Sequence, residues 1–111
     1  MYPFIAPSLL AADFSNLARD IEMINQSEAD WLHLDVMDGV FVPNISFGFP
    51  VMKAVAKHCT KPLDVHLMIV EPEKYVRRFV EAGADYVTFH YEATEKIQEC
   101  IDRIRKAGAK V

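Results

Sequence analysis

The chain has 111 residues, of which 51% are hydrophobic and 25% are charged, so one modest globular domain is expected. Its net charge is −4 and no basic run occurs, which argues against nucleic-acid binding, and no apolar stretch approaches the roughly 20 residues that cross a membrane. Cys59 and Cys100 lack paired spacing, which favours reduced thiols and a cytoplasmic location.

Short apolar runs alternate with amphipathic patterns along the chain. The pattern predicts strands over residues 4–8, 31–37, 63–68 and 86–89. It predicts helices over residues 16–25, over 50–58, from 71 to a cap at Gly83, and over 94–106 with a cap at Gly108. The predicted buried face of the third helix consists of Tyr75, Val76, Phe79 and Val80.

Strands that alternate with helices through short joins imply a parallel sheet, because each crossover returns the chain to the same edge. Four such βα units are half of a (β/α)8 barrel of the TIM type. A helix end that turns into a strand recurs at residues 28–32, 83–87 and 108–111, and the last copy stops where a fifth strand is expected. We therefore interpret residues 1–111 as the N-terminal half of a longer barrel. The alternative is a self-contained four-unit α/β sandwich.

The most informative segment is residues 32–44, which read L-H-L-D-V-M-D-G-V-F-V-P-N. Side chains alternate between the two faces of a strand, so His33 and Asp35 share one face. Residues 64–68, D-V-H-L-M, present His66 in the same way on the next strand. We predict that these three side chains hold a divalent metal (Zn, Fe, Mn or Co) in a catalytic site with open positions. The alternative is a hydrogen-bonded cluster without metal.

Polar side chains end all four predicted strands, where parallel barrels place their functional groups. These are Ser8, His33, Asp35, His66 and His90, and we expect them to share one site. Met37 and Met68 lie two residues beyond an inward polar side chain on their strands. A soft sulfur side chain there can pack against a planar, electron-rich intermediate. Ordinary core filling is the alternative for both methionines.

Further polar residues lie close to these positions. Asp38, Asn44 and Ser46 occupy the loop expected over residues 38–49, where they brace the backbone or contact a substrate. Asp64 precedes His66 by two residues and either orients a metal ligand or caps a neighbouring helix. The sequence leaves these alternatives open.

Four segments together carry a family resemblance. They read I-A-P-S-L-L-A-A-D-F at 5–14, L-H-L-D-V-M-D-G-V-F-V-P-N-I-S-F-G at 32–48, D-V-H-L-M at 64–68 and T-F-H-Y-E-A at 88–93. In their order and spacing these segments resemble the D-ribulose-5-phosphate 3-epimerase family, and the second is highly specific. The resemblance covers essentially the whole chain. It implies a (β/α)8 barrel that interconverts ribulose 5-phosphate and xylulose 5-phosphate in the pentose phosphate pathway.

The resemblance also implies a role for each matching residue. Asp35 would be one acid/base, and His33, Asp35 and His66 would be metal ligands. Ser8 and His66 would contact the sugar phosphate substrate. The family takes its second acid, which is also its fourth metal ligand, from an Asp late in the barrel.

The loops and methionines are assigned by the same resemblance. Met37 and Met68 would cover the reactive face, and Asn44 would lie with residues 45–48 in a mobile loop over the substrate. The family grips phosphate with Gly-rich loops in its later half, whereas this chain has four glycines and no such cluster.

We therefore expect residues 1–111 to be inactive as an isolated monomer. The partners expected of the active protein are a sugar phosphate and further copies of the same chain in a homo-oligomer. One alternative is a sister epimerase that acts on a six-carbon ketose phosphate such as allulose 6-phosphate. The other is a non-catalytic half-barrel fragment.

Overall fold

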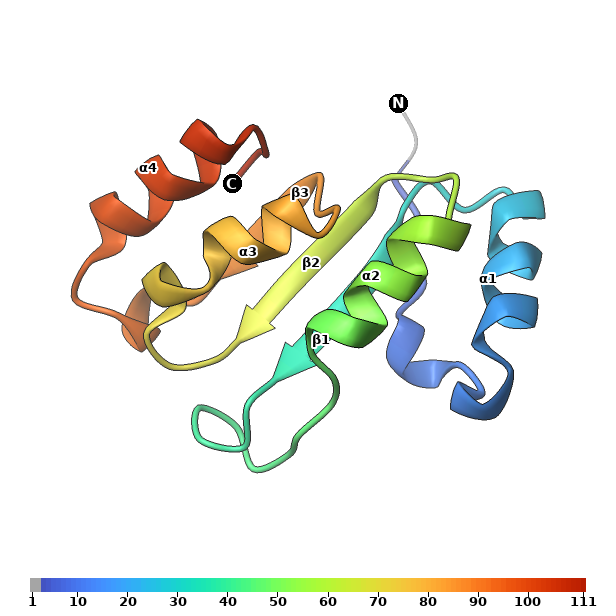
Figure 1. Ribbon diagram of the computed structural model, residues 1–111, viewed down its shortest axis with the longest axis horizontal. Coiled ribbons are helices and arrows are strands. Elements are labelled where there is room, and N and C mark those ends of the chain that lie inside the picture. Colours follow the sequence, from blue (N-terminus) through green and yellow to red (C-terminus); the bar gives the residue numbers. More distant parts are fainter. Residues whose placement is uncertain (1–2) are drawn as a thin grey trace.

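A computed structural model describes residues 3–111 as one parallel sheet covered by helices. The strands are β1 (Leu32–Met37), β2 (Leu63–Met68) and β3 (Tyr86–Phe89), in the order β1-β2-β3, and the helices are α1 (Leu17–Gln26), α2 (Phe49–His58), α3 (Val76–Glu81) and α4 (Ile97–Ala107). Short 3-10 turns are η1 (Leu9–Ala11), η2 (Phe14–Asn16), η3 (Pro72–Lys74) and η4 (Tyr91–Ala93). In Figure 1, α2 and α3 lie in front of the sheet, with α1 and α4 at its two sides. No helix among these residues is both long and apolar enough to cross a membrane.

One face of the sheet is apolar. β1 and β2 bury every second side chain, namely Leu32, Leu34, Val36, Leu63, Val65 and Leu67. These side chains form the core together with buried helix residues that include Met52, Val55, Val76 and Ile104. Since side chains alternate along a strand, the residues between them emerge on the opposite face, which we call the polar face. Burial of the apolar residues therefore decides which side chains the polar face presents.

The expected strand over residues 4–8 is not a strand in the structure. The segment lies beside β1, but a single parallel bridge, between Ser8 and His33, joins the two. The backbone N–H of His33 donates to Pro7 O at 2.9 Å. Because Pro7 has no backbone N–H, it cannot donate the hydrogen bond that a regular ladder with β1 requires. The prediction was wrong about the element, although the segment does lie where a strand beside β1 was expected.

The single helix expected from residue 71 is split in two. Tyr75 separates η3 from α3 with a φ of −124°, which is outside the helical range. Val76 and Phe79 are buried and Val80 is partly buried, as the periodicity predicts, but Tyr75 is exposed. The break in the helix therefore removes Tyr75 from the predicted buried face.

The last helix starts later than the sequence predicts. Thr94 Oγ1 accepts a hydrogen bond from the N–H of Lys96 at 2.9 Å, and this local turn precedes the first residue of α4, Ile97. Gly83 and Gly108 follow α3 and α4 with φ values of 125° and 107°, as expected of glycines that end helices.

Three aromatic rings stack at the amino ends of the strands. Trp31, which precedes β1, lies with its ring centroid 4.2 Å from that of Tyr86 on β3 and 5.0 Å from that of Phe4. The backbone of Lys110 forms a parallel bridge with Tyr86, so it lies beside β3 at the same end of the sheet. The stack thus connects the N-terminal segment with the two edge strands of the described sheet, β1 and β3.

Asp38 organises the loop that follows β1. Its Oδ1 accepts from the backbone N–H groups of Val40 and Phe41 at 2.9 and 2.8 Å, and its Oδ2 accepts from that of Val70 at 2.8 Å. Burial alone would raise the pKa of Asp38, but these three donors outweigh it and hold the pKa below its usual range. The carboxylate therefore ties the loop after β1 to the segment after β2.

Replacing Asp38 with Asn is expected to weaken the dependence of stability on acid. A carboxylate whose pKa is lower in the folded state stabilises the fold fully above its unfolded-state pKa, and this stabilisation is lost as pH falls through the folded-state pKa. Urea unfolding followed from neutral pH down to about pH 3 should therefore show a smaller loss of stability for D38N than for the parent. The exposed Asp102→Asn variant controls for the change in net charge. An acid dependence in D38N equal to that of the parent would contradict the role of Asp38.

Candidate metal centre

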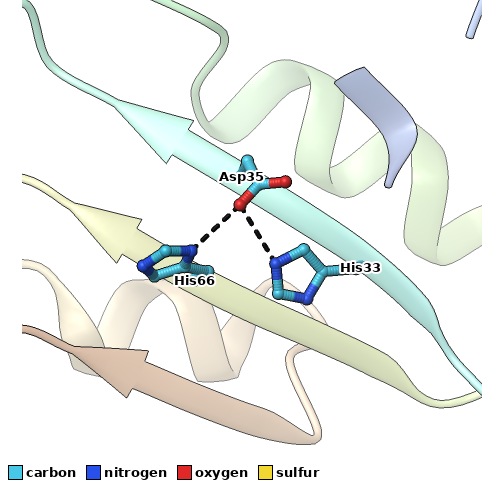
Figure 2. Close-up of side chains that lie close together, drawn as sticks. All are labelled: His33, Asp35 and His66. Atoms are coloured by element: carbon cyan, nitrogen blue, oxygen red, sulfur yellow. Dashed lines mark hydrogen bonds and ion pairs between the residues drawn. The ribbon is translucent and has the colours of Figure 1, made fainter. Parts of the chain in front are cut away.

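His33, Asp35 and His66 meet on the polar face: His33 is the second residue of β1, so it does not end its strand as expected, and Asp35 and His66 are the fourth residues of β1 and β2. His33 Nε2 and His66 Nδ1 each lie 3.0 Å from the same oxygen, Asp35 Oδ1. Figure 2 shows the two rings converging on the carboxylate from neighbouring strands. One ligand atom from each residue lies within 4.8 Å of those of the other two. The structure thus brings together the three side chains that the sequence groups as metal ligands.

Strand pairing explains this convergence. His33 and Asp35 are two residues apart on β1, so they emerge on the same face. The parallel register places Asp35 directly beside His66 on β2. A register slip of one residue would put a leucine or a valine beside the carboxylate instead.

Ser8 completes the surroundings of the Asp35 carboxylate. Its hydroxyl donates to Asp35 Oδ2 at 2.6 Å, which leaves Oδ1 to the two histidines. Burial alone would raise the pKa of Asp35, but the hydrogen bonds from Ser8 and His66, together with the charge interaction with His33, outweigh burial and lower it. Asp35 is therefore a charged, partly buried carboxylate at neutral pH.

The other nitrogen of each imidazole also has a partner. His33 Nδ1 lies 2.8 Å from Asp64 Oδ2, so the structure places Asp64 against a predicted ligand rather than at a helix end. His66 Nε2 lies 2.7 Å from His90 Nε2, and His90 Nδ1 lies 3.2 Å from Glu92 Oε1. Both rings are thus held from the side that faces away from Asp35.

The contacts of His33 show that the cluster fits a cation. A neutral imidazole has one N–H, yet each nitrogen of His33 faces a carboxylate oxygen at hydrogen-bond distance. If the N–H of His33 faces Asp64, then the lone pair on its Nε2 faces the lone pairs of Asp35 Oδ1, and the two repel each other. A cation that binds both atoms removes this repulsion. An imidazolium is the metal-free way to satisfy both carboxylates. Two imidazoles and one carboxylate suit Zn, Fe, Mn or Co and leave coordination positions open.

The other predicted site residues lie along the same strands and the loop between them. Met37 and Met68 are register partners at the ends of β1 and β2, and both are partly exposed on the polar face. Asn44 Nδ2 lies 3.7 Å from Met37 Sδ. Ser46 braces the loop as expected, because its hydroxyl donates to Asp35 O at 2.7 Å and accepts from the N–H of Met37 at 2.9 Å.

Glu92 is the one member of this network that the sequence reasoning did not anticipate. It is paired with His90, which was expected at the rim without a defined partner. The signal that could have revealed the pair is the spacing of His90 and Glu92, because it repeats the spacing of His33 and Asp35.

A family model described as the ribulose-phosphate 3 epimerase family matches residues 4–111. The chain is 50% identical over 107 residues to a ribulose-phosphate 3-epimerase of Schizosaccharomyces pombe, in a match that covers 94% of this chain and 47% of that protein. A ribulose-phosphate 3-epimerase of Synechocystis is 49% identical over 108 residues, with 96% and 47% covered. The chain spans about half the length of the curated relatives it matches.

The fold also matches a solved structure. It resembles orotidine 5'-monophosphate decarboxylase from Methanocaldococcus jannaschii, complexed with the inhibitor BMP, with a TM-score of 0.64 over 96% of this chain and 47% of that one. At 14% identity this likeness concerns the fold alone. It confirms the expected class, an α/β chain made of βα units of a (β/α)8 barrel. Together with the family match over residues 4–111, these findings establish that the chain belongs to the ribulose-phosphate 3-epimerase family.

Proposed function

We propose that the protein containing this chain inverts C3 of a ketopentose phosphate and so interconverts D-ribulose 5-phosphate and D-xylulose 5-phosphate. The observation that carries the proposal is the convergence of His33, Asp35 and His66, whose ligand atoms lie within 4.8 Å of one another, in a chain of this family. A sugar phosphate is accordingly the proposed substrate. Self-association and a cytoplasmic location stay predictions of the sequence.

Asp35 is the proposed base for the first half of the reaction. Epimerisation at a carbon next to a ketone removes the proton from C3, and the electron pair of the C–H bond moves toward the ketone oxygen to give an ene-diolate. When bound by His33, Asp35 and His66, a divalent cation supplies Lewis-acid stabilisation of that negative charge, a contribution of several kcal/mol. The contacts that lower the pKa of Asp35 also make it a weaker base, so it depends on a substrate proton of increased acidity.

The second half of the reaction returns a proton to the opposite face of C3. This step needs an acid across the substrate from Asp35. Within residues 3–111, His33, Asp35 and His66 form the single group of at least three potential ligand residues close enough to share a cation. We place the second acid, and the groups that grip phosphate, in the half of the relatives that this chain does not span.

The neighbouring side chains have proposed roles in binding. Ser8 orients the Asp35 carboxylate through its 2.6 Å hydrogen bond and contacts substrate beside it. Met37 and Met68 pack against the planar ene-diolate and keep water from protonating it. Asn44, beside the sulfur of Met37, contacts substrate from the loop.

Replacing Asp35 with Asn in the complete protein is expected to reduce kcat by about 10²- to 10⁴-fold, the usual contribution of a positioned acid/base. The amide cannot accept the C3 proton. Exchange of that proton with D2O, followed by NMR, measures the step directly. The Asp102→Asn variant, on the exposed side of α4, is the control and should keep the parent rate. A D35N protein that exchanges the proton at the parent rate would exclude Asp35 as the base.

Removal of divalent metal is expected to abolish turnover reversibly. After dialysis against a chelator, the complete protein should lose activity in step with its metal content, because the charge on the ene-diolate is no longer stabilised. Addition of Zn, Mn, Fe or Co, each tested separately, should restore it and identify the preferred ion. Undiminished turnover by protein shown to be metal-free would disprove the Lewis-acid role.

The isolated 111-residue chain is expected to show no epimerase activity with any of these metals, because inversion needs an acid on each face of C3. A coupled assay with ribulose 5-phosphate, run beside the complete protein at the same concentration, makes this comparison. Circular dichroism of the chain establishes that it is folded when it is assayed. Turnover by the folded chain at a rate normal for an enzyme would refute the expectation.

A further inference from the structure

The ring of His66 is held between two partners. Its Nδ1 faces Asp35 Oδ1 at 3.0 Å, and its Nε2 faces His90 Nε2 at 2.7 Å. His90 is therefore on the far side of the ring from the proposed cation. It is not among the three residues whose ligand atoms converge, so any influence of His90 on the cation passes through His66.

His90 is itself fixed from two directions. Its Nδ1 lies 3.2 Å from Glu92 Oε1 in η4, and its ring lies against Phe41 of the loop after β1, with centroids 5.1 Å apart. Two aromatic rings at this distance have a favourable tilted arrangement. The position of His90 is thus set by Glu92 of the turn that follows β3 and by Phe41 of the loop that follows β1.

A cation bound by His33, Asp35 and His66 would give each of these hydrogen bonds a direction. A carboxylate can only accept, so the contact with Glu92 requires the proton of neutral His90 on Nδ1, and its Nε2 is then an acceptor. With a cation on the lone pair of His66 Nδ1, the single N–H of this ring is on Nε2 and donates to His90 Nε2. His33 has the same arrangement, because Asp64 accepts from its Nδ1 and leaves Nε2 to the cation.

We propose that His90, held by Glu92, is a positioning residue that orients His66 and selects the tautomer in which Nδ1 binds the divalent cation. The inference rests on the proposed function, since it assumes the cation site. Asp64 fixes the ring and the proton of His33 directly, and Glu92 fixes those of His66 through His90. Such outer partners usually raise the affinity of a metal ligand by fixing its ring and its proton.

The test compares two substitutions of His90 in the complete protein. His90→Phe keeps a ring against Phe41 but has no acceptor for the N–H of His66, whereas His90→Gln retains a polar oxygen at a similar reach. Co²⁺ binding is measured by calorimetry and by the visible absorption of the bound ion. We expect H90F to bind Co²⁺ about 10- to 100-fold more weakly and H90Q to lose less than about 10-fold. His58→Gln, an exposed position at the end of α2, is the control and should bind like the parent.

A second measurement examines the protons directly. In the Zn²⁺-loaded parent, the nitrogen chemical shifts of the two imidazoles should place the protons on Nε2 of His66 and on Nδ1 of His90. Loss of Glu92 in a Glu92→Ala variant should release the proton of His90 to either nitrogen. A proton found on Nδ1 of His66 overturns the proposal.

The outcomes separate this inference from the proposed function. Equal Co²⁺ affinity and equal spectra for the folded parent and H90F overturn the role of His90 and leave the proposed reaction standing. A parent protein that takes up no Co²⁺ overturns the cation site and the role of His90 with it. Weaker binding by H90F, rescued in H90Q, supports the role of His90 even if the complete protein proves to have no epimerase activity.

Discussion

The parallel pairing of β1 with β2 is the constraint on which the polar face depends. Leu34 and Val65 are register partners and are completely buried, so a shift of either strand by one residue would turn apolar side chains to the polar face. A shift by two residues would preserve the faces but separate Asp35 from His66. The geometry of the cluster is therefore maintained by burial of hydrocarbon on the other side of the sheet, and its polar contacts follow from that packing.

The cluster that results is rich in negative charge and in lone pairs. Asp35 is held in its charged form by Ser8 and the two histidines, while Asp64 contacts the outer nitrogen of His33 and Glu92 contacts His90. Carboxylates gathered in this way favour a cation among them. Partly buried carboxylates are stable only where charge or hydrogen bonds compensate them, and here Ser8 and the imidazoles do so. The cluster suits the divalent cation of the proposed function.

The sequence predicts the face on which each ligand lies better than it predicts where elements begin and end. Alternation alone puts His33 and Asp35 together, and its repetition at residues 64–68 brings in His66. The strand expected over residues 4–8 is absent because the apolar pattern that predicted it takes no account of Pro7, which lacks the N–H that a regular ladder needs. The contact between His66 and His90 could not be predicted, since it depends on the register of β2 with β3 and on the short turn that follows β3.

The aromatic stack at the opposite end of the strands has a practical consequence. Trp31 is the only tryptophan of the chain, and its ring lies between those of Phe4 and Tyr86. Its fluorescence therefore reports whether the rings of Phe4 and Tyr86 are packed against Trp31, which requires the N-terminal segment and β3 to be in place. Tryptophan fluorescence follows assembly of the sheet, and the visible absorption of bound Co²⁺ follows occupation of the cluster, so both can be monitored in one sample.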